Sequence, residues 1–328
     1  MSDCANCPQA QTRSGTAWTA PPREDPLSGI LNVDKPPDMT SHDVVDVIRR
    51  IVGQRRVGHA GTLDPMATGV LLVCLGQATR MSQYLMAGRK RYRATIVLGA
   101  TTDTYDADGE VVTTGQRSDF TRDEMGTALQ GFVGRISQVP PMYSAIKKDG
   151  KPLYQLARQG KTVEREPRTV EIDEISLLDW AAPALIIEVG CSPGTYIRSL
   201  AHDLGRALGT GAYLASLVRL QSGRFRLEDA VSLSRLEEAF RNGQEMEYVL
   251  PPDEALLEWP AMVVGAEGAR RISHGQSVPC RSLAGADLGE RCRAYSADGE
   301  FLAIMSYDKA LDRWRPTKVF APAGSTSE

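Results

Sequence analysis

The chain has 328 residues, of which 42% are hydrophobic and 24% charged, and this composition is typical of a folded protein with room for two or three domains. Its formal net charge is -3, so it lacks the positive field of a protein that coats nucleic acid indiscriminately, and contact with RNA or DNA would have to use local basic patches. We see no secretory signal, no apolar stretch long enough to span a bilayer and no secreted disulfide framework, which together favour the cytoplasm.

The N-terminal part is predicted to begin with a disordered leader. Residues 1–28 are polar, contain four prolines and show no periodicity, which is typical of an unfolded segment. The Cys4-x-x-Cys7 pair in it lacks the second half of a zinc site, so we expect no metal there. The elements expected next are a strand over 29–36, a helix over 40–52 capped by Thr40 or Ser41, a buried strand or the start of a buried helix over 70–75, and a strand over 92–98.

The remaining chain predicts a second series of strands and helices. These elements are a hairpin at Asp108-Gly109, a helix to about Phe132 with Thr121 and Glu124 as a capping box, a strand over 185–189, a helix over 197–208 and an acidic helix plus linker over 228–258. Residues 137–168 are basic and contain prolines, and we expect a mobile loop there. We therefore expect an α+β domain over 29–250, with a mixed, largely antiparallel sheet flanked by helices, and a small β-rich domain over 259–322.

The segment 58–69, GHAGTLDPMATG, places a single acid, Asp64, among glycines and a proline. An aspartate in a turn is usually an ordinary surface residue. Here, however, the glycines allow the backbone to approach a ligand closely and Pro65 restrains the chain beside the acid. The loop could therefore hold an exposed carboxylate in a fixed orientation.

This segment resembles the catalytic motif of the TruB family of tRNA pseudouridine synthases, and the resemblance extends over about 29–225. Three further segments are similar to family motifs in the same order: Val33-Asp34-Lys35-Pro36, the stretch 90–93 with 102–109, and Cys191 to Leu200. Because four motifs occur in order, the resemblance is specific. It implies the pseudouridine synthase fold followed by a small PUA-like RNA-binding domain.

The resemblance implies that the chain isomerises uridine to pseudouridine at position 55, in the T-loop of tRNA, without a cofactor. It assigns Asp64 as the catalytic carboxylate and Arg198 as its ion-pair partner, which we expect to keep the pKa of Asp64 low. It assigns Tyr92 to the active site, where the ring could stack on an extruded base or the hydroxyl could assist removal of a proton.

The same resemblance names residues that would bind the substrate. These are His59, Tyr196, Leu217, Lys35 and Asp106. His59 would contact the flipped RNA, since the target uridine must be extracted from the folded T-loop. A histidine with a structural hydrogen bond, and tyrosine or leucine side chains that pack in the core, are the plain alternatives.

Two basic segments, 80–93 and 147–168, could contact the phosphates of the tRNA T-arm. The resemblance implies that the second covers the RNA as a mobile loop, and in the C-terminal domain Arg270, Arg271, His274 and Gly275 could touch the acceptor side. We expect a monomer that uses no DNA, membrane or metal.

Three other functions stay open at this point. A non-catalytic tRNA-binding or tRNA-folding protein on the same fold would not need Asp64. A metal-dependent hydrolase could use His42-Asp43, His59, Asp64 and His202-Asp203. A guide-RNA-dependent relative is disfavoured because the chain lacks long basic extensions.

Overall fold

A computed structural model describes residues 18–22, 26–115, 119–148, 150–279 and 290–320. Its main feature is a nine-stranded mixed sheet in the order β1-β3-β12-β4-β11-β10-β7, with β2 beside β3 and β13 beside β12. The strands are β1 (Gly29–Lys35), β2 (Val57–Ala60), β3 (Thr68–Leu75), β4 (Lys90–Leu98), β7 (Gly134–Gln138), β10 (Arg168–Ala181), β11 (Ala184–Cys191), β12 (Ala212–Ser222) and β13 (Phe225–Arg226). Only β12 and β3 pair in parallel among these strands, so the expected largely antiparallel sheet is confirmed.

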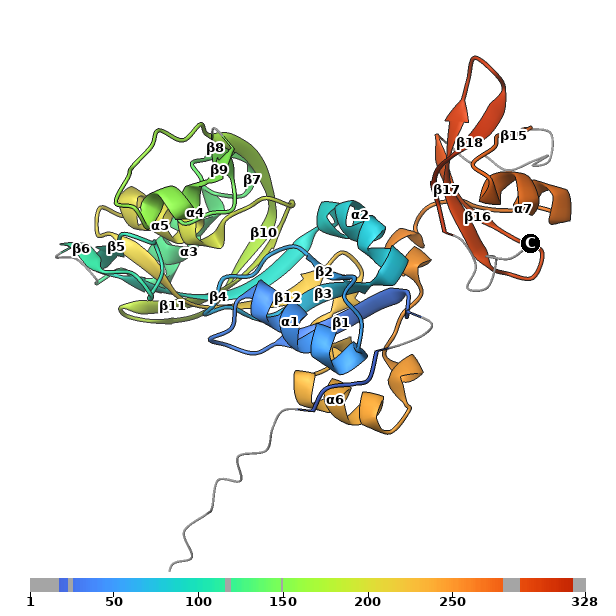
Figure 1. The fold of residues 1–328 in the computed structure, drawn as a ribbon. Coiled ribbons are helices and arrows are strands. Elements are labelled where there is room, and N and C mark those ends of the chain that lie inside the picture. The colour runs from blue at the N-terminus through green and yellow to red at the C-terminus, as the bar shows by residue number, and fades with distance from the viewer. Residues whose placement is uncertain (1–17, 23–25, 116–118, 149, 280–289, 321–328) are drawn as a thin grey trace, which may run out of the picture.

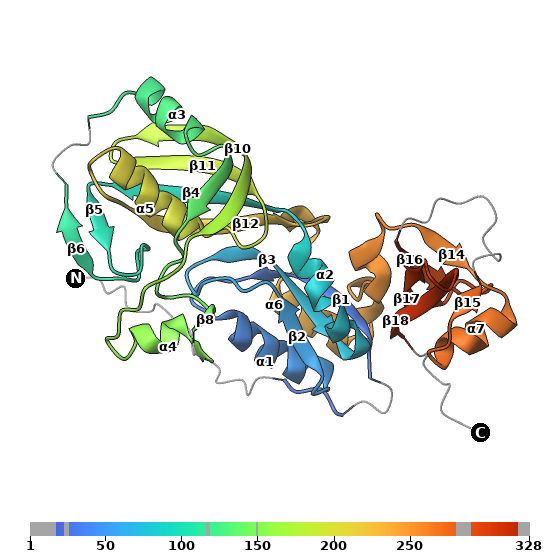
Figure 2. The same ribbon diagram turned by 90° about the horizontal axis from the view of Figure 1, so that it is seen from above.

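Helices flank this sheet at both ends (Figure 2). They are α1 (Ser41–Val52), α2 (Ser82–Ala87), α3 (Arg122–Gln130), α4 (Leu153–Ala157), α5 (Ile197–Ala207) and α6 (Leu233–Arg241). Helix α1 forms where expected, because Thr40 caps it in a capping box with Asp43 and its apolar side chains recur on one buried face. The capping box of Thr121 and Glu124 likewise starts α3.

The apolar run of β3 is buried on both faces of the sheet. Leu71 and Val73 belong to one apolar cluster, which also contains the buried side chains of α1, whereas Val70 and Leu72 belong to a second cluster with η1 (Gly76–Met81) and α2. This two-sided burial explains why the run is continuous rather than alternating. It also decides between the two expectations for 70–75 in favour of a strand.

The segment expected as a loop over 137–168 contains short elements of its own. Strands β8 (Lys147–Lys148) and β9 (Lys151–Pro152) form a hairpin that leads into α4. A second small hairpin, β5 (Ala100–Thr102) with β6 (Val111–Thr114), carries the turn at Asp108-Gly109 that the sequence predicted.

A separate C-terminal lobe follows helix α6 and the connecting segment 242–260 (Figure 1). It is a five-stranded sheet of β14 (Ala261–Val263), β16 (Arg291–Tyr295), β17 (Phe301–Asp308), β18 (Arg313–Val319) and β15 (Val278–Pro279), covered by α7 (Ala266–Ser273). Arg80 joins this lobe to η1, since its Nη1 donates to the carbonyl of Val319 at 2.5 Å and its guanidinium lies over the ring of Phe320.

The leader is only partly as expected. Residues 1–17 and 23–25 lie outside the described residues, but Trp18 packs against the main core and the amide of Ala20 donates to the carbonyl of Arg50. Leu27 exchanges two hydrogen bonds with the side chain of Gln54. The expectation of disorder is therefore wrong for 18–22 and 26–28, because apolar contacts and hydrogen bonds hold them against the folded domain, at Arg50 on α1 and at Gln54 just after it. None of the described helices combines the length and apolarity needed to cross a bilayer.

Candidate active site

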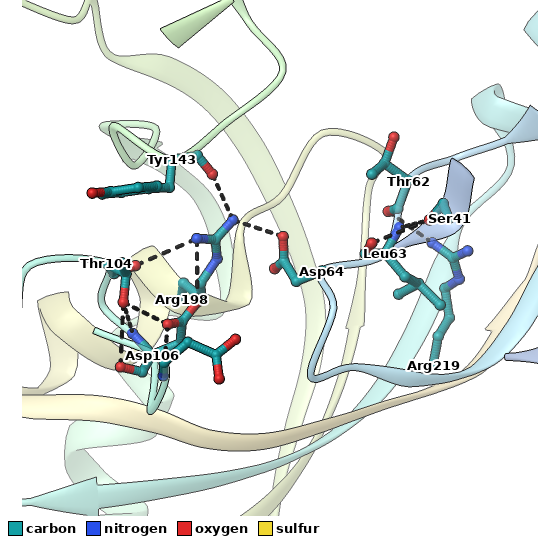
Figure 3. Close-up of polar contacts among 10 residues, drawn as sticks. Ser41, Thr62, Leu63, Asp64, Thr104, Asp106, Tyr143, Arg198 and Arg219 are labelled. Atoms are coloured by element: carbon teal, nitrogen blue, oxygen red, sulfur yellow. Dashed lines mark hydrogen bonds and ion pairs between the residues drawn. The ribbon is translucent and has the colours of Figure 1, made fainter. Parts of the chain in front are cut away.

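The loop that carries Asp64 connects β2 to β3 and is held by its backbone. Ser41, at the start of α1, accepts from the amide of Leu63 at 2.8 Å and donates to the carbonyl of the same residue at 3.1 Å (Figure 3). After the acid, the amide of Ala67 donates to the carbonyl of Asp64 at 3.1 Å. The loop is thus a tight turn anchored on α1, and it leaves the Asp64 side chain 31% exposed.

Position 69 requires glycine because strand β12 lies too close for a side chain. Its φ is 94°, and a Cβ there would lie 2.4 Å from the carbonyl oxygen of Arg219 on β12. Gly61 also has a left-handed φ of 91°, which favours glycine. The close approach that the sequence suggested for a ligand is, at Gly69, an approach to β12.

Arg198 is the residue that orients Asp64 (Figure 3). Its Nη2 donates to Oδ1 of Asp64 at 2.8 Å and to the carbonyl of Tyr143 at 2.9 Å. Its Nη1 lies 3.3 Å from Oδ2 of Asp106 and 3.4 Å from the carbonyl of Thr104. Because the Arg198 side chain is only 6% exposed, the guanidinium is a buried bridge between the acid and two loops.

Asp106 binds Arg198 from the loop that joins β5 to β6. The hydroxyl of Thr104 and the amide of Asp108 both donate to Oδ1 of Asp106, so Oδ2 is left for Arg198. Asp106 is 4% exposed. This placement gives Asp106 the geometry of a positioning group, in place of the substrate contact that the resemblance implied.

The net pKa shift of Asp64 is opposite to the one expected. Burial raises the pKa of the Asp64 carboxyl above its ordinary value, Arg198 opposes this, and the negative charges of Asp106 and Asp108 add to it. The expectation of a low pKa is wrong because partial burial of the carboxylate, together with the two nearby acids, outweighs its ion pair with Arg198.

Lys35 is also placed differently from its expected role. It is 0% exposed, and its Nζ donates to the carbonyls of Pro36 at 2.8 Å, Pro65 at 2.9 Å and Ala67 at 2.6 Å. Burial lowers the pKa of Lys35 to about 8. All three donors of the ammonium are used within the protein, so the expected substrate contact is replaced by support of the Asp64 loop.

Arg219 is a site residue that the sequence analysis missed. It is 1% exposed, and its guanidinium donates to the carbonyls of Val70 at 2.6 Å, Gly61 at 3.0 Å and Thr62 at 3.5 Å. The available signal was a charged residue two positions after Leu217 in an apolar strand, since both side chains then share one face.

Tyr92, Tyr196 and Leu217 are further site residues named from the sequence. Tyr92 on β4 is 8% exposed and lies opposite Arg219 in the strand pairing, while Leu217 on β12 is 6% exposed. Burial, with smaller contributions that include the charge of Asp64, raises the pKa of the hydroxyls of Tyr92 and Tyr196. Both tyrosines are therefore neutral near pH 7 and lie within electrostatic reach of Asp64.

His59 lies on β2, at the start of the loop, and is half-buried. Burial lowers the pKa of its imidazole, and its Nδ1 has no hydrogen-bond partner in the described part of the protein. Nothing in that part of the chain brings three His, Cys, Asp or Glu side chains together as a possible metal site. The residues suggested for a metal-dependent hydrolase are thus not assembled for that chemistry there.

The basic segment 80–93 is not a free positive patch. Arg89 pairs with Glu171 and Asp173, and Arg93 with Glu188; Arg91 also pairs with Glu174. Lys90 is 7% exposed and donates to backbone carbonyls. Acids on neighbouring strands thus offset much of the positive charge of Arg89, Arg91 and Arg93, and the RNA contact expected for this segment stays a prediction.

Comparison with known proteins agrees with the geometry. The family model for the TruB family pseudouridylate synthase N-terminal domain matches residues 49–197, and the model for the tRNA pseudouridylate synthase B C-terminal domain matches residues 198–258. A tRNA pseudouridine synthase B from Dehalococcoides mccartyi is 44% identical over 90% of this chain and 97% of its own length. The chain belongs to the TruB family.

Further comparisons extend this assignment to the whole fold. A tRNA pseudouridine synthase B from Syntrophotalea carbinolica is 49% identical over 76% of this chain and 81% of its own. One chain of a crystal structure of a Cbf5-Nop10-Gar1 complex superposes with a TM-score of 0.70 at 28% identity, covering 90% of this chain and 85% of that one. The TruB chain is thus a tRNA pseudouridine synthase, an isomerase, with the pseudouridine synthase fold and a PUA-like C-terminal half-barrel, as the sequence predicted.

Proposed function

We propose that this TruB enzyme isomerises the uridine at position 55, in the T-loop of tRNA, and that Asp64 is the catalytic carboxylate. The observation that carries the proposal is a partly exposed carboxylate held by a buried guanidinium: the side chain of Asp64 is 31% exposed and that of Arg198 is 6% exposed. The acid can meet a substrate, while the arginine fixes its orientation from within the protein.

The reaction breaks the N1–C1′ glycosidic bond and forms a C5–C1′ bond, and C5 loses a proton while N1 gains one. The change is redox-neutral and needs no group donor. An ionised Asp64 supplies a nucleophile or base at the reacting centre. The neutral hydroxyls of Tyr92 and Tyr196 and the apolar side chain of Leu217 would line the base. This is consistent with the burial of Tyr92 and Leu217 and with the influence of the Asp64 charge on the pKa of both tyrosines.

A base in a folded T-loop reaches such a carboxylate only when it is flipped out of its stack. In this proposal the neutral ring of His59 contacts the flipped RNA. His59 is half-buried and lies on β2, just before the loop that carries Asp64. The segment 137–168 moves over the RNA in this proposal. Its place beside the site is supported by the carbonyl of Tyr143, which accepts from Arg198. The C-terminal lobe adds a second tRNA contact, and the enzyme acts as a cytoplasmic monomer without a cofactor.

A carbodiimide-adduct map of pseudouridine in an unmodified tRNA transcript, with EDTA present, tests the proposal. We expect one modified T-loop uridine with the wild type and none with Asp64→Asn. Asp46→Asn is the matched control, since Asp46 is an exposed carboxylate on α1 that pairs with Arg49. Full activity of Asp64→Asn, or modification outside the T-loop, would contradict the proposal, and tRNA binding without modification by the wild type would favour a binding or folding role.

A further inference from the structure

Tyr105 has an unusual backbone conformation directly beside Asp106. Its φ is 65°, a left-handed value that is unfavourable for a non-glycine residue and persists only where its surroundings enforce it. The backbone on both sides is docked on β12: the amide of Leu214 donates to the carbonyl of Tyr105 at 3.0 Å, and the amide of Ala107 donates to the carbonyl of Leu214 at 2.9 Å. The strained residue is thus held at a defined place next to the partner of Arg198.

The side chain of Tyr105 is stacked on His202. The two ring centroids are 3.9 Å apart and the ring planes differ by 13°. His202 lies on α5, four residues after Arg198, so the two side chains project from the same face of the helix one turn apart. Helix α5 therefore binds the loop at two successive residues, with His202 on Tyr105 and Arg198 on Asp106.

The ring face of His202, and not a hydrogen bond, makes this contact. Its Nδ1 is buried and has no hydrogen-bond partner in the described residues. Burial, together with the charges of Arg206 and Arg165, lowers the pKa of the imidazole. A neutral ring stacked at this distance is an apolar contact that another aromatic ring could replace.

We propose that His202 and Tyr105 are positioning residues for pseudouridine formation, which hold the left-handed turn so that Asp106 keeps Arg198 aligned on Asp64. This inference rests on the proposed catalytic role of Asp64. Neither ring needs to touch the RNA. Loss of the stack would let the turn relax, Asp106 would shift away from Arg198, and the carboxylate would lose its fixed orientation.

Single-turnover rates at saturating enzyme, with tRNA dissociation constants measured separately, test the proposal. His202→Ala should lower the rate about ten-fold, since small misplacements of reacting groups have effects of this size or larger, and leave tRNA affinity within about two-fold. His202→Phe and Tyr105→Phe should stay near the wild-type rate because both keep an aromatic stack. Leu129→Ala, in the buried core at α3, is a control for a general loss of stability and should not lower the rate.

Three results would overturn the proposal: a wild-type rate for His202→Ala, a rate for His202→Phe as low as for His202→Ala, or a slower reaction explained by weaker tRNA binding. If His202→Ala does not fold, His202→Leu keeps an apolar side chain without a ring and takes its place.

A double substitution separates this proposal from the catalytic assignment. When Arg198→Lys is already present, adding His202→Ala should lower the single-turnover rate little further, because the stack acts through Arg198. If the two substitutions instead lower the rate additively, His202 does not act through Arg198. If Asp64→Asn is active, the catalytic assignment fails whatever His202 does; if Asp64→Asn is inactive and His202→Ala is unimpaired, the positioning proposal alone fails.

Discussion

Lys35 and Arg219 support opposite ends of the loop that carries Asp64, and both bind its backbone. Nζ of Lys35 donates to the carbonyls of Pro65 and Ala67 after the acid, whereas Nη2 of Arg219 donates to the carbonyl of Gly61 before it. Both side chains are nearly inaccessible to solvent. A buried cation is tolerated only when its donors are satisfied, so these hydrogen bonds couple the position of the loop to the folding of β1 and β12.

Removal of one support should destabilise the fold. Arg219→Met leaves the carbonyls of Gly61, Thr62 and Val70 without their donor, and each unsatisfied buried acceptor costs about 1–3 kcal/mol. We expect the free energy of unfolding to fall by about 3 kcal/mol in urea titrations, since part of the loss is recovered by relaxation. Arg235→Met on α6 is the control and should stay near wild type, because Arg235 is a largely exposed residue; an equal loss in both variants would contradict the assignment.

Arg198 should not be replaceable by lysine. Its planar guanidinium binds Asp64, Asp106 and two carbonyls at once, and an ammonium on a shorter arm cannot reproduce that fork. We expect Arg198→Lys to lower the single-turnover rate about 100-fold. Arg206→Lys, an exposed position on the same helix, should change it less than about two-fold. A similar small effect in both variants would show that alignment of Asp64 does not limit the rate.

The pH dependence of the rate should reflect the raised pKa of Asp64. Since the ionised carboxylate reacts, activity should be lost on acidification at a pH above the ordinary value of 3.8 for aspartate. The charge of Asp108 contributes to the raised pKa, so Asp108→Asn should move the acidic limb of the single-turnover profile to lower pH. An unmoved limb, or a move to higher pH, would show that another group controls it.

The effect of Asp64 on folding stability should have the opposite pH dependence to its effect on the rate. A carboxyl whose pKa is higher in the folded than in the unfolded state favours folding below the unfolded pKa, and this contribution is lost as pH rises through the folded pKa. At neutral pH the ionised Asp64 therefore opposes folding, and Asp64→Asn should raise the melting temperature. The difference from wild type should shrink toward zero on acidification in thermal melts. A variant that melts lower at pH 7 would mean that the ion pair with Arg198 outweighs burial.

The two basic segments should differ in their salt dependence of tRNA binding. Lys147, Lys151 and Lys161 are exposed in the segment proposed to cover the RNA, and replacing a lysine that binds a phosphate should reduce the slope of log affinity against log salt by about one. Arg91 and Arg93 pair with Glu174 and Glu188 on the sheet, so Arg91→Gln with Arg93→Gln should leave that slope unchanged. Filter binding at several salt concentrations measures both, and a reversed result would place the RNA on the sheet face.

The local elements could be read from the sequence because their signals are local. Helix α1 follows from the Thr40 cap and apolar residues at helical spacing, and the turn at Asp108-Gly109 follows from its glycine. The order of residues 18–22 and 26–28 could not be predicted from the sequence, since their polar composition does not reveal that Trp18 packs against an apolar surface of the folded domain. An interaction of that kind depends on residues distant in sequence.

The sequence by itself determined the family, helices with clear local signals such as α1 and α3, and the choice of Asp64 and Arg198 as candidate site residues, since these depend on residue types at fixed spacing. The tertiary structure decided what each charge does. Arg198 lies 134 positions from Asp64, Lys35 has no exposure to solvent, and Arg89 and Arg93 pair with acids on neighbouring strands. The physical reason is that the energy of a charge depends on burial and on the partners around it, and only the folded chain brings those partners together.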